Sequence, residues 1–295
     1  MAVNHGPVVQ SALLRRELVR LRRDRGLTQQ QVAGNLEWSP SKLIRIEGGN
    51  SSITKVDLDA LLSQYEVGSE TERERLQSLN RGARERGWWD GYKDDLSPAY
   101  LNYIGFEAGA SFIRQFQIGF LPGLLQTREY ARVVTTVGSV DPREVDKFVE
   151  LRLRRQQELA RRENRPQQYF VLDEAVIRRH VGINTSRAIM PAQLRSIADR
   201  AEHDDRLTVR VIPFESGAHP GMFGTFTLLE FDGQLPDVLY LEAAVEHYFM
   251  FGENDPRLST PRTSKNCWWT RCPRRSPSNS CGAWRRRCHE AIRKS

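Results

Sequence analysis

The chain has 295 residues, of which 39% are hydrophobic and 27% are charged, so it is long enough for about two folded domains of ordinary composition. No stretch approaches the roughly 18 uninterrupted apolar residues of a membrane span, and the first residues lack the pattern of a secretory signal. The formal net charge of +7 points first to a polyanionic partner.

The positive charge is unevenly distributed along the chain. Residues 1–56 contain nine Lys and Arg against four Asp and Glu, whereas residues 256–295 contain eleven against one. Residues 1–255 are therefore slightly acidic as a whole, and the C-terminal segment produces the entire basic surplus. Because charges act over about 8–10 Å in physiological salt, the local surplus near the N-terminus is better evidence for nucleic-acid binding than the net charge is.

The first 86 residues predict five short helices. Apolar spacing favours a helix over residues 11–25, with Leu14, Leu18 and Leu21 on one face and arginines on the others. Four further helices start at residues 29, 40, 55 and 70. Each is preceded by a residue that favours a helix N-cap: Thr28, Ser39, Thr54 and Ser69.

The second and third predicted helices form a helix-turn-helix pattern, in which the third helix enters the DNA major groove. The candidate DNA-contacting residues are Gln29, Gln30, Ser39, Pro40, Ser41, Lys42, Ile44, Arg45 and Asn50. We expect Lys42 to pair with a phosphate and Arg45 to bind the edge of a guanine, while Ile44 either contacts a thymine methyl group or packs inward. The alternative interpretation is an ordinary solvated helix surface.

The same residues carry a resemblance to a known family. The segments GLTQQQVA at 26–33 and WSPSKLIRIEG at 38–48 resemble the lambda-repressor-like, or xenobiotic-response-element type, helix-turn-helix. In that family the turn usually holds a glycine where this chain has Glu37, and a non-glycine residue in a left-handed turn costs about 1 kcal/mol, so we expect a slightly different turn. The resemblance implies a five-helix domain that binds double-stranded DNA as a homodimer.

Residues 87–255 predict a second domain in which helices precede strands. We expect helices over residues 102–118, 122–134, 141–164 and 191–200, and strands over 168–172, 207–212, 224–231, 238–241 and 246–251. The aromatic residues at 88–106 indicate a hinge whose rings pack on the next domain, the alternative being a small-molecule pocket. The expected fold class is mainly α, followed by an α+β domain with a mainly antiparallel sheet.

Short motifs in this second domain carry another resemblance. The segments FLPGLLQTREYA at 120–131, DEAV at 173–176 and VIPF at 211–214 are similar to a group of regulators from high-GC bacteria, in which a lambda-repressor-like head precedes an uncharacterised effector domain. This resemblance implies an antitoxin-like transcriptional regulator whose second domain senses a ligand or a small acidic protein encoded by a neighbouring gene. It leaves open whether DNA binding or partner binding is the main role.

Signatures of catalysis are not found in the sequence. It lacks the Gly-rich nucleotide-binding motifs, the Gly-x-Ser-x-Gly motif and the His-Glu-x-x-His motif. The acid and histidine residues at 203–205 and 242–247 favour a polar turn and a strand edge, since a metal site needs at least three converging ligands. The arginines at 152, 154 and 155 favour a solvated helix face over a contact with DNA or an acidic protein. We therefore expect a cytoplasmic, nucleoid-associated protein that is not an enzyme and has no cofactor or metal.

Residues 256–295 form an unusual tail that holds all four cysteines, Cys267, Cys272, Cys281 and Cys288. The tail is rich in Arg, Pro, Ser and Trp and shows neither a helical nor an alternating apolar period. A zinc module is one interpretation, although structural zinc sites usually pair ligands more closely in sequence. A disordered segment or a shift of reading frame near residue 256 is the other, and the composition favours it.

Overall fold

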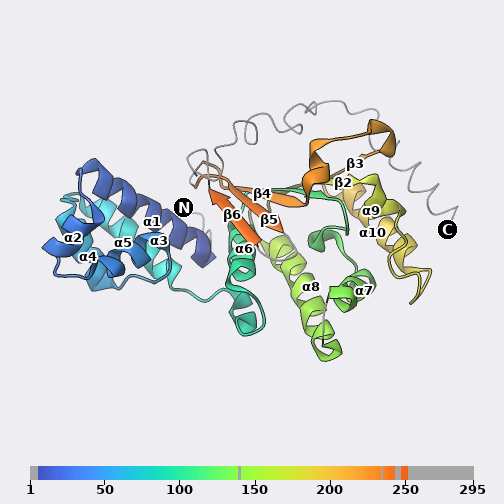
Figure 1. Cartoon of the computed structure of the whole chain (residues 1–295), viewed down its shortest axis with the longest axis horizontal. Coiled ribbons are helices and arrows are strands. Elements are labelled where there is room, and N and C mark those ends of the chain that lie inside the picture. Colours follow the sequence, from blue (N-terminus) through green and yellow to red (C-terminus); the bar gives the residue numbers. More distant parts are fainter. Residues whose placement is uncertain (1–5, 139–140, 234, 243–246, 252–295) are drawn as a thin grey trace. The chain divides into compact units, whose positions relative to one another are not determined.

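The computed structural model describes residues 6–138, 141–233, 235–242 and 247–251 of the chain (Figure 1). The contacts of the described residues divide into two compact units, the first reaching to Gly109 and including part of residues 232–235, and the second comprising the described residues of 110–231 and those that follow Leu235. The sequence places the boundary after residue 86, so this division assigns residues 87–109 to the first unit instead. The cysteine-rich tail lies outside the described residues.

The first unit is helical. Its elements are α1 (Gly6–Asp24), α2 (Gln29–Asn35), α3 (Pro40–Gly48), α4 (Lys55–Gln64), α5 (Glu70–Ala83), the 3-10 turn η1 (Trp88–Tyr92) and α6 (Pro98–Gly109). The five predicted helices are confirmed, although α1 begins earlier than expected.

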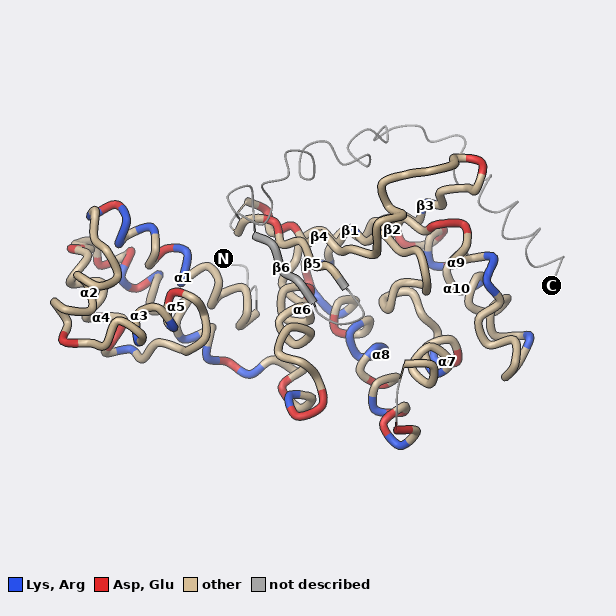
Figure 2. The backbone as a smooth tube through the Cα atoms, in the orientation of Figure 1, with Lys and Arg blue, Asp and Glu red and all other residues tan. Residues whose placement is uncertain are grey.

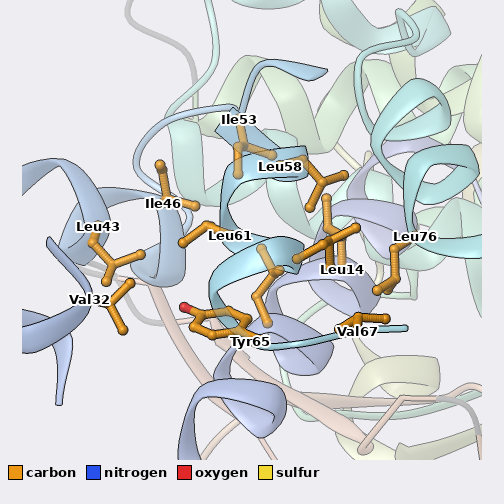
Figure 3. Close-up of a cluster of buried hydrophobic side chains, with 12 residues drawn as sticks. Leu14, Val32, Leu43, Ile46, Ile53, Leu58, Leu61, Tyr65, Val67 and Leu76 are labelled. Carbon is orange, nitrogen blue, oxygen red and sulfur yellow. The ribbon is translucent and has the colours of Figure 1, made fainter. Parts of the chain in front are cut away.

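The apolar stripes of α1 to α5 meet in one hydrophobic core (Figure 3). Leu18 of α1, Leu43 of α3 and Leu58 of α4 are completely buried. Burial of each such side chain contributes about 1.5–3 kcal/mol. This core holds α3 at a fixed orientation within the first unit.

The aromatic segment after α5 also belongs to the first unit. Trp89 is 5% exposed, and a Cβ atom on Gly105 of α6 would come within 3.1 Å of its ring. Trp88 meets Trp89 edge to face, with ring centroids 5.6 Å apart. The ring of Trp89 thus lies beside α6, a helix that the sequence analysis assigns to the second domain.

The second unit combines helices with one mixed sheet. Its helical elements are η2 (Gly123–Leu125), α7 (Arg128–Gly138), η3 (Pro142–Glu144), α8 (Val145–Arg161), α9 (Glu174–Arg178), α10 (Ile189–His203), η4 (Phe214–Ser216) and η5 (Pro220–Phe223). Its strands are β1 (Phe112–Gln117), β2 (Gln167–Asp173), β3 (Leu207–Ile212), β4 (Phe226–Glu230), β5 (Val238–Glu242) and β6 (His247–Phe251).

The strands lie in the order β3-β2-β1-β4-β5-β6. The pairings of β1 with β4, β4 with β5 and β5 with β6 are antiparallel, whereas β2 is parallel to both β1 and β3. The predicted α+β class is thus confirmed, with a parallel part that the sequence analysis did not foresee.

The predicted helix over residues 102–118 is wrong in its second half. α6 ends at Gly109, and residues 112–117 form β1, which lies inside the sheet between β2 and β4. Ile113 and Phe116 are fully buried there. Pairing on both sides satisfies the backbone of this short segment, whose apolar positions 112, 113 and 116 also fit helical spacing, so periodicity alone does not distinguish it from a helix. The predicted helix over residues 122–134 is likewise split, into η2 and α7.

The DEAV motif ties the connection between β3 and β4 to the end of β2. Asp173 accepts a hydrogen bond from the backbone N–H of Ala175, and its second oxygen lies 3.2 Å from Nε2 of His219. Glu174, which is 3% exposed, accepts a hydrogen bond from the backbone N–H of Phe214. The motif therefore has a structural role in this unit.

Candidate nucleic-acid interface

The start of α2 is fixed by a reciprocal capping box. The Thr28 hydroxyl accepts a hydrogen bond from the backbone N–H of Gln31 at 3.2 Å, and the Gln31 side chain accepts one from the backbone N–H of Thr28 at 2.9 Å. These bonds satisfy two N–H groups that a helix start otherwise leaves open. The sequence therefore defines where α2 begins.

The turn between α2 and α3 contains a non-glycine residue in the left-handed conformation. Glu37 has a φ of 53°, and the N–H of Trp38 donates to the carbonyl of Ala33 at 2.8 Å. The turn thus keeps a left-handed residue despite lacking glycine, which corrects the expectation of a different turn. The conformation costs about 1 kcal/mol for a residue with a Cβ atom.

α3 begins at Pro40 directly after Ser39. Ser39 has the extended backbone of an N-cap residue, but its side chain makes no capping hydrogen bond. A proline at the first helical position costs nothing, because that N–H has no partner within the helix. The exposed Ser39 hydroxyl therefore stays available at the N-terminus of α3.

A polar cluster beneath α3 joins it to α1 and α2. Arg22 of α1 donates two hydrogen bonds to the Glu47 carboxylate, at 2.7 and 2.9 Å, and Gln29 donates a third at 2.7 Å. The Arg22 and Glu47 side chains are only 11% and 4% exposed. This places the predicted DNA-contacting residue Gln29 in an internal contact, which fixes its amide group.

Tyr65 is buried in the hydrophobic core of the first unit (Figure 3), and it interacts electrostatically with Glu47 and Arg22 of the polar cluster. Burial raises the pKa of Tyr65, and the negative charge of Glu47 raises it further. The Tyr65 hydroxyl therefore stays protonated and uncharged at physiological pH.

The outer face of α3 matches the helical spacing predicted from sequence. Leu43 and Ile46 are buried, whereas Ser41, Ile44 and Arg45 are exposed. Ile44 is 50% exposed, so of its two predicted positions the structure selects the outward one. Among the described residues, the Arg45 side chain has no hydrogen-bond or ion-pair partner. Its guanidinium group is thus free to bind a base edge or a phosphate.

Lys42 is held within the protein. Its ammonium group lies 2.7 Å from a carboxylate oxygen of Asp57 and 3.8 Å from the centroid of the Trp38 ring. The expectation that Lys42 pairs with a phosphate therefore does not describe this arrangement, because Asp57 and Trp38 already engage its charge. A phosphate would have to compete with both contacts.

The remaining predicted residues surround α3. Gln30 and Pro40 are exposed at the starts of α2 and α3, and Asn50 is exposed just beyond the end of α3. Gly49, at the C-terminus of α3, has a left-handed φ of 79°, and the backbone N–H of Asn50 donates to the carbonyl of Arg45. Pro40 and Asn50 therefore lie at the two ends of α3, and Gln30 lies at the start of α2.

One further exposed basic residue of the first unit, Lys55, is not among the residues predicted to contact DNA. Lys55 is the first residue of α4, and it is exposed. A cation at a helix N-terminus opposes the helix dipole, which makes the residue unusual and was the available signal. The connection from α3 to α4 is short, so Lys55 follows Asn50 closely along the chain.

Basic residues are also spread along α1, and its last turn carries Arg22 and Arg23 (Figure 2). Several are used within the unit: Arg20 pairs with Glu17 and Asp24, and Arg22 pairs with Glu47. The basic surplus of the first residues therefore overstates the charge that is free to meet DNA.

The metal-capable residues singled out in the sequence have ordinary contacts where the structure describes them. Nδ1 of His203 lies 2.7 Å from the carbonyl oxygen of Asp199, and Asp204 pairs with Arg165 at 3.2 Å. The side chains at 242–247 lie outside the described residues. Within the described part of the chain, no three potential metal ligands gather, and no helix is both long and apolar enough to cross a membrane.

Comparisons with known proteins give two family matches. A model described as "Helix-turn-helix domain" matches residues 13–76, which contain α2, α3 and the turn between them. A model described as "Domain of unknown function (DUF5753)" matches residues 100–256 and ends where the composition of the tail begins. Neither the curated proteins nor the solved structures give a match.

Proposed function

The chain belongs to the DUF5753 family and carries a helix-turn-helix domain before that domain, and from this pairing we propose that it is a sequence-specific DNA-binding regulator of transcription. The observation that carries the proposal is the outer face of α3. There the unpartnered Arg45 lies beside the exposed Ile44 and Ser41 on a helix held by a buried core.

These side chains match the chemistry of base recognition. A guanidinium group donates two parallel hydrogen bonds to the O6 and N7 atoms of guanine, and an apolar side chain packs against the thymine methyl group. Serine hydroxyls donate to phosphates or bases. In our proposal Arg45 and Ile44 read bases, whereas Ser39, Ser41 and Lys55 contact the DNA backbone.

The resemblance of the first 86 residues, the head, to lambda-repressor-like domains supports a two-fold arrangement on DNA. Proteins of this architecture bind paired half-sites about one helical turn apart, and the symmetry of the operator follows that of the protein. We therefore propose that the protein binds as a homodimer in the cytoplasm, where the nucleoid is accessible to it.

The second unit is proposed to sense a ligand or a partner protein and to bias DNA binding, with no catalytic activity of its own. A partner-binding role is supported by the apolar residues between β3 and β4, where Phe214, Met222 and Phe223 are 59%, 62% and 96% exposed. Exposed large apolar side chains on one connection between strands are a feature of interaction sites. The alternative function, an antitoxin-like protein that acts mainly through such a partner, predicts a tight complex with the product of a neighbouring gene and no protected operator.

Selection of genomic DNA fragments by the purified protein tests the proposal. The wild-type protein should enrich a small set of fragments that share one motif, and Arg45→Ala should lose that preference. Arg81→Ala removes the same charge from the exposed end of α5 and should leave the motif unchanged. Enrichment of fragments without a common motif would argue against sequence-specific binding.

A further inference from the structure

A small cavity in the second unit lies where the chain enters β2 and β3. Its volume is about 40 Å³, which is room for a few water-sized groups. Gln156 of α8 and Arg200 of α10 line it, together with Arg165 before β2 and Asp204 and Arg206 before β3. Because β2 and β3 are parallel neighbours, the segments that lead into them lie at the same end of the two strands (Figure 1).

The cavity lining carries an excess of positive charge. Three arginines, Arg165, Arg200 and Arg206, face one carboxylate, Asp204, which gives a formal charge of +2. Arg165 lies 3.2 Å from Asp204, and Arg206 donates to the carbonyl of Arg165 at 2.5 Å. Each guanidinium group has five N–H donors, and each of these contacts uses only one of them.

Arg200 of α10 is partly buried. It donates to the carbonyl of Leu124 at 2.9 Å. Burial lowers the pKa of Arg200, and only Asp204 counteracts this effect. A cation that has lost water in this way is stabilised by a bound anion.

A buried hydrogen-bond acceptor in the lining adds a second requirement on the ligand, namely a hydrogen-bond donor. Oε1 of Gln168, which lies in β2 and also lines the cavity, has no hydrogen-bond partner among the described residues. An unsatisfied buried acceptor is destabilising, so a ligand that supplies a hydroxyl group is favoured here. The neighbouring Gln156 does not satisfy it, because its amide donates to the carbonyls of Gly123 and Gln126.

We propose that this cavity binds the monohydrogen phosphate ion. Its two negative charges balance the formal +2 of the lining, its oxygens accept from the arginine N–H groups, and the hydroxyl of a monohydrogen phosphate donates to Gln168. A carboxylate has one charge and no donor, so it meets these requirements less well. The volume admits this ion itself, which carries both the two charges and the donating hydroxyl.

This inference deepens the proposed function, because it gives the chemical class of a ligand for the second unit. Only the idea that this ligand alters DNA binding rests on the proposed function. Binding of phosphate to the cavity can be measured without DNA, so the failure of one proposal is distinguishable from the failure of the other.

Titration calorimetry of the full chain with inorganic phosphate, at constant ionic strength, tests the site. The wild-type protein should bind one phosphate per chain. Arg200→Gln should weaken binding about tenfold or more, because it removes a buried charged donor. Arg195→Gln, an exposed arginine on the same helix, is the matched control and should change nothing.

Asp204→Asn provides a test in the opposite direction. It removes the competing carboxylate while keeping an oxygen that accepts from the backbone N–H of Arg206, so it should tighten phosphate binding several-fold. A damaged fold cannot tighten binding, so this variant decides the matter even if Arg200→Gln fails to fold. No saturable phosphate binding, unchanged or weaker binding in Asp204→Asn, or equally tight binding of acetate would each overturn the proposal.

Discussion

Arg22 and Glu47 form a bidentate ion pair that joins the last turn of α1 to the end of α3, with nitrogen–oxygen distances of 2.7 and 2.9 Å. Arg22 also donates to the carbonyl of Leu27, and Gln29 of α2 donates to the same carboxylate. Three helices of the head are therefore connected through one buried carboxylate, on the helix that presents Arg45 outward.

Glu47→Gln should destabilise the protein. The substitution leaves the Arg22 charge buried without a counter-ion, and breaking a buried pair in this way typically costs about 3 kcal/mol. The loss should appear as a lower urea midpoint for unfolding of the head. Glu66→Gln removes the exposed partner of Arg25, and its cost should stay below about 1 kcal/mol. Equal midpoints for the two variants would show that the Glu47 pair does not hold α3.

Asp57→Asn should strengthen DNA binding. Asp57 holds the Lys42 ammonium group, so removing its charge frees Lys42 for a phosphate and reduces repulsion of the DNA. One additional phosphate contact raises the steepness of the salt dependence by about one unit. Affinity measured across a salt series should show this change. Asp94→Asn, which removes an exposed charge elsewhere in the first unit, is the control. An unaltered salt slope in Asp57→Asn would mean that Lys42 stays away from the DNA.

The lowered pKa of the Asp57 carboxylate makes the stability of the protein depend on pH. Burial alone would raise the pKa of Asp57, but the hydrogen bonds from Lys42 and Thr54 outweigh it, and the pKa lies below its ordinary value. The unfolded chain then binds this proton more readily, so the contribution of Asp57 is present above the ordinary carboxyl pKa of about 3.9 and is lost as pH falls through the folded value. The difference in unfolding free energy between wild type and Asp57→Asn should shrink below about pH 4. A difference that is constant from pH 7 to pH 3 would contradict this linkage.

Glu37→Gly should stabilise the head by up to about 1 kcal/mol. Glycine adopts the φ of 53° found at this position without the penalty that a Cβ atom brings. Glu37→Ala keeps the Cβ atom while removing the charge, so it separates strain from electrostatics. The thermal midpoint should rise for glycine and not for alanine. If both variants behave alike, the turn is not strained.

The predictability of the molecule from sequence differs between local and long-range features. Caps such as Thr28 and the apolar spacing of Leu43 and Ile46 act within a single helix, and the helices of the head follow from them. β1 was mistaken for helix because its identity depends on pairing with β2 and β4, which are far away in the chain.

The same distinction applies to the candidate interface. The exposure of Arg45 follows from helical spacing, and the structure bears it out. The internal use of Lys42 and Gln29 could not be predicted, because their partners Asp57 and Glu47 are 15 and 18 residues away in sequence. Residue type and spacing identify which side chains suit DNA, whereas tertiary contacts decide which of them are free.

The most direct test of the central claim is footprinting on a selected operator with wild-type and Arg45→Ala protein. We predict that the wild-type protein protects two half-sites about one helical turn apart. Arg45→Ala should bind about 5- to 150-fold more weakly, equivalent to about 1–3 kcal/mol, and should tolerate any base at one position of each half-site. An identical footprint and identical base preference for the two proteins would contradict the assignment of α3 as the recognition helix.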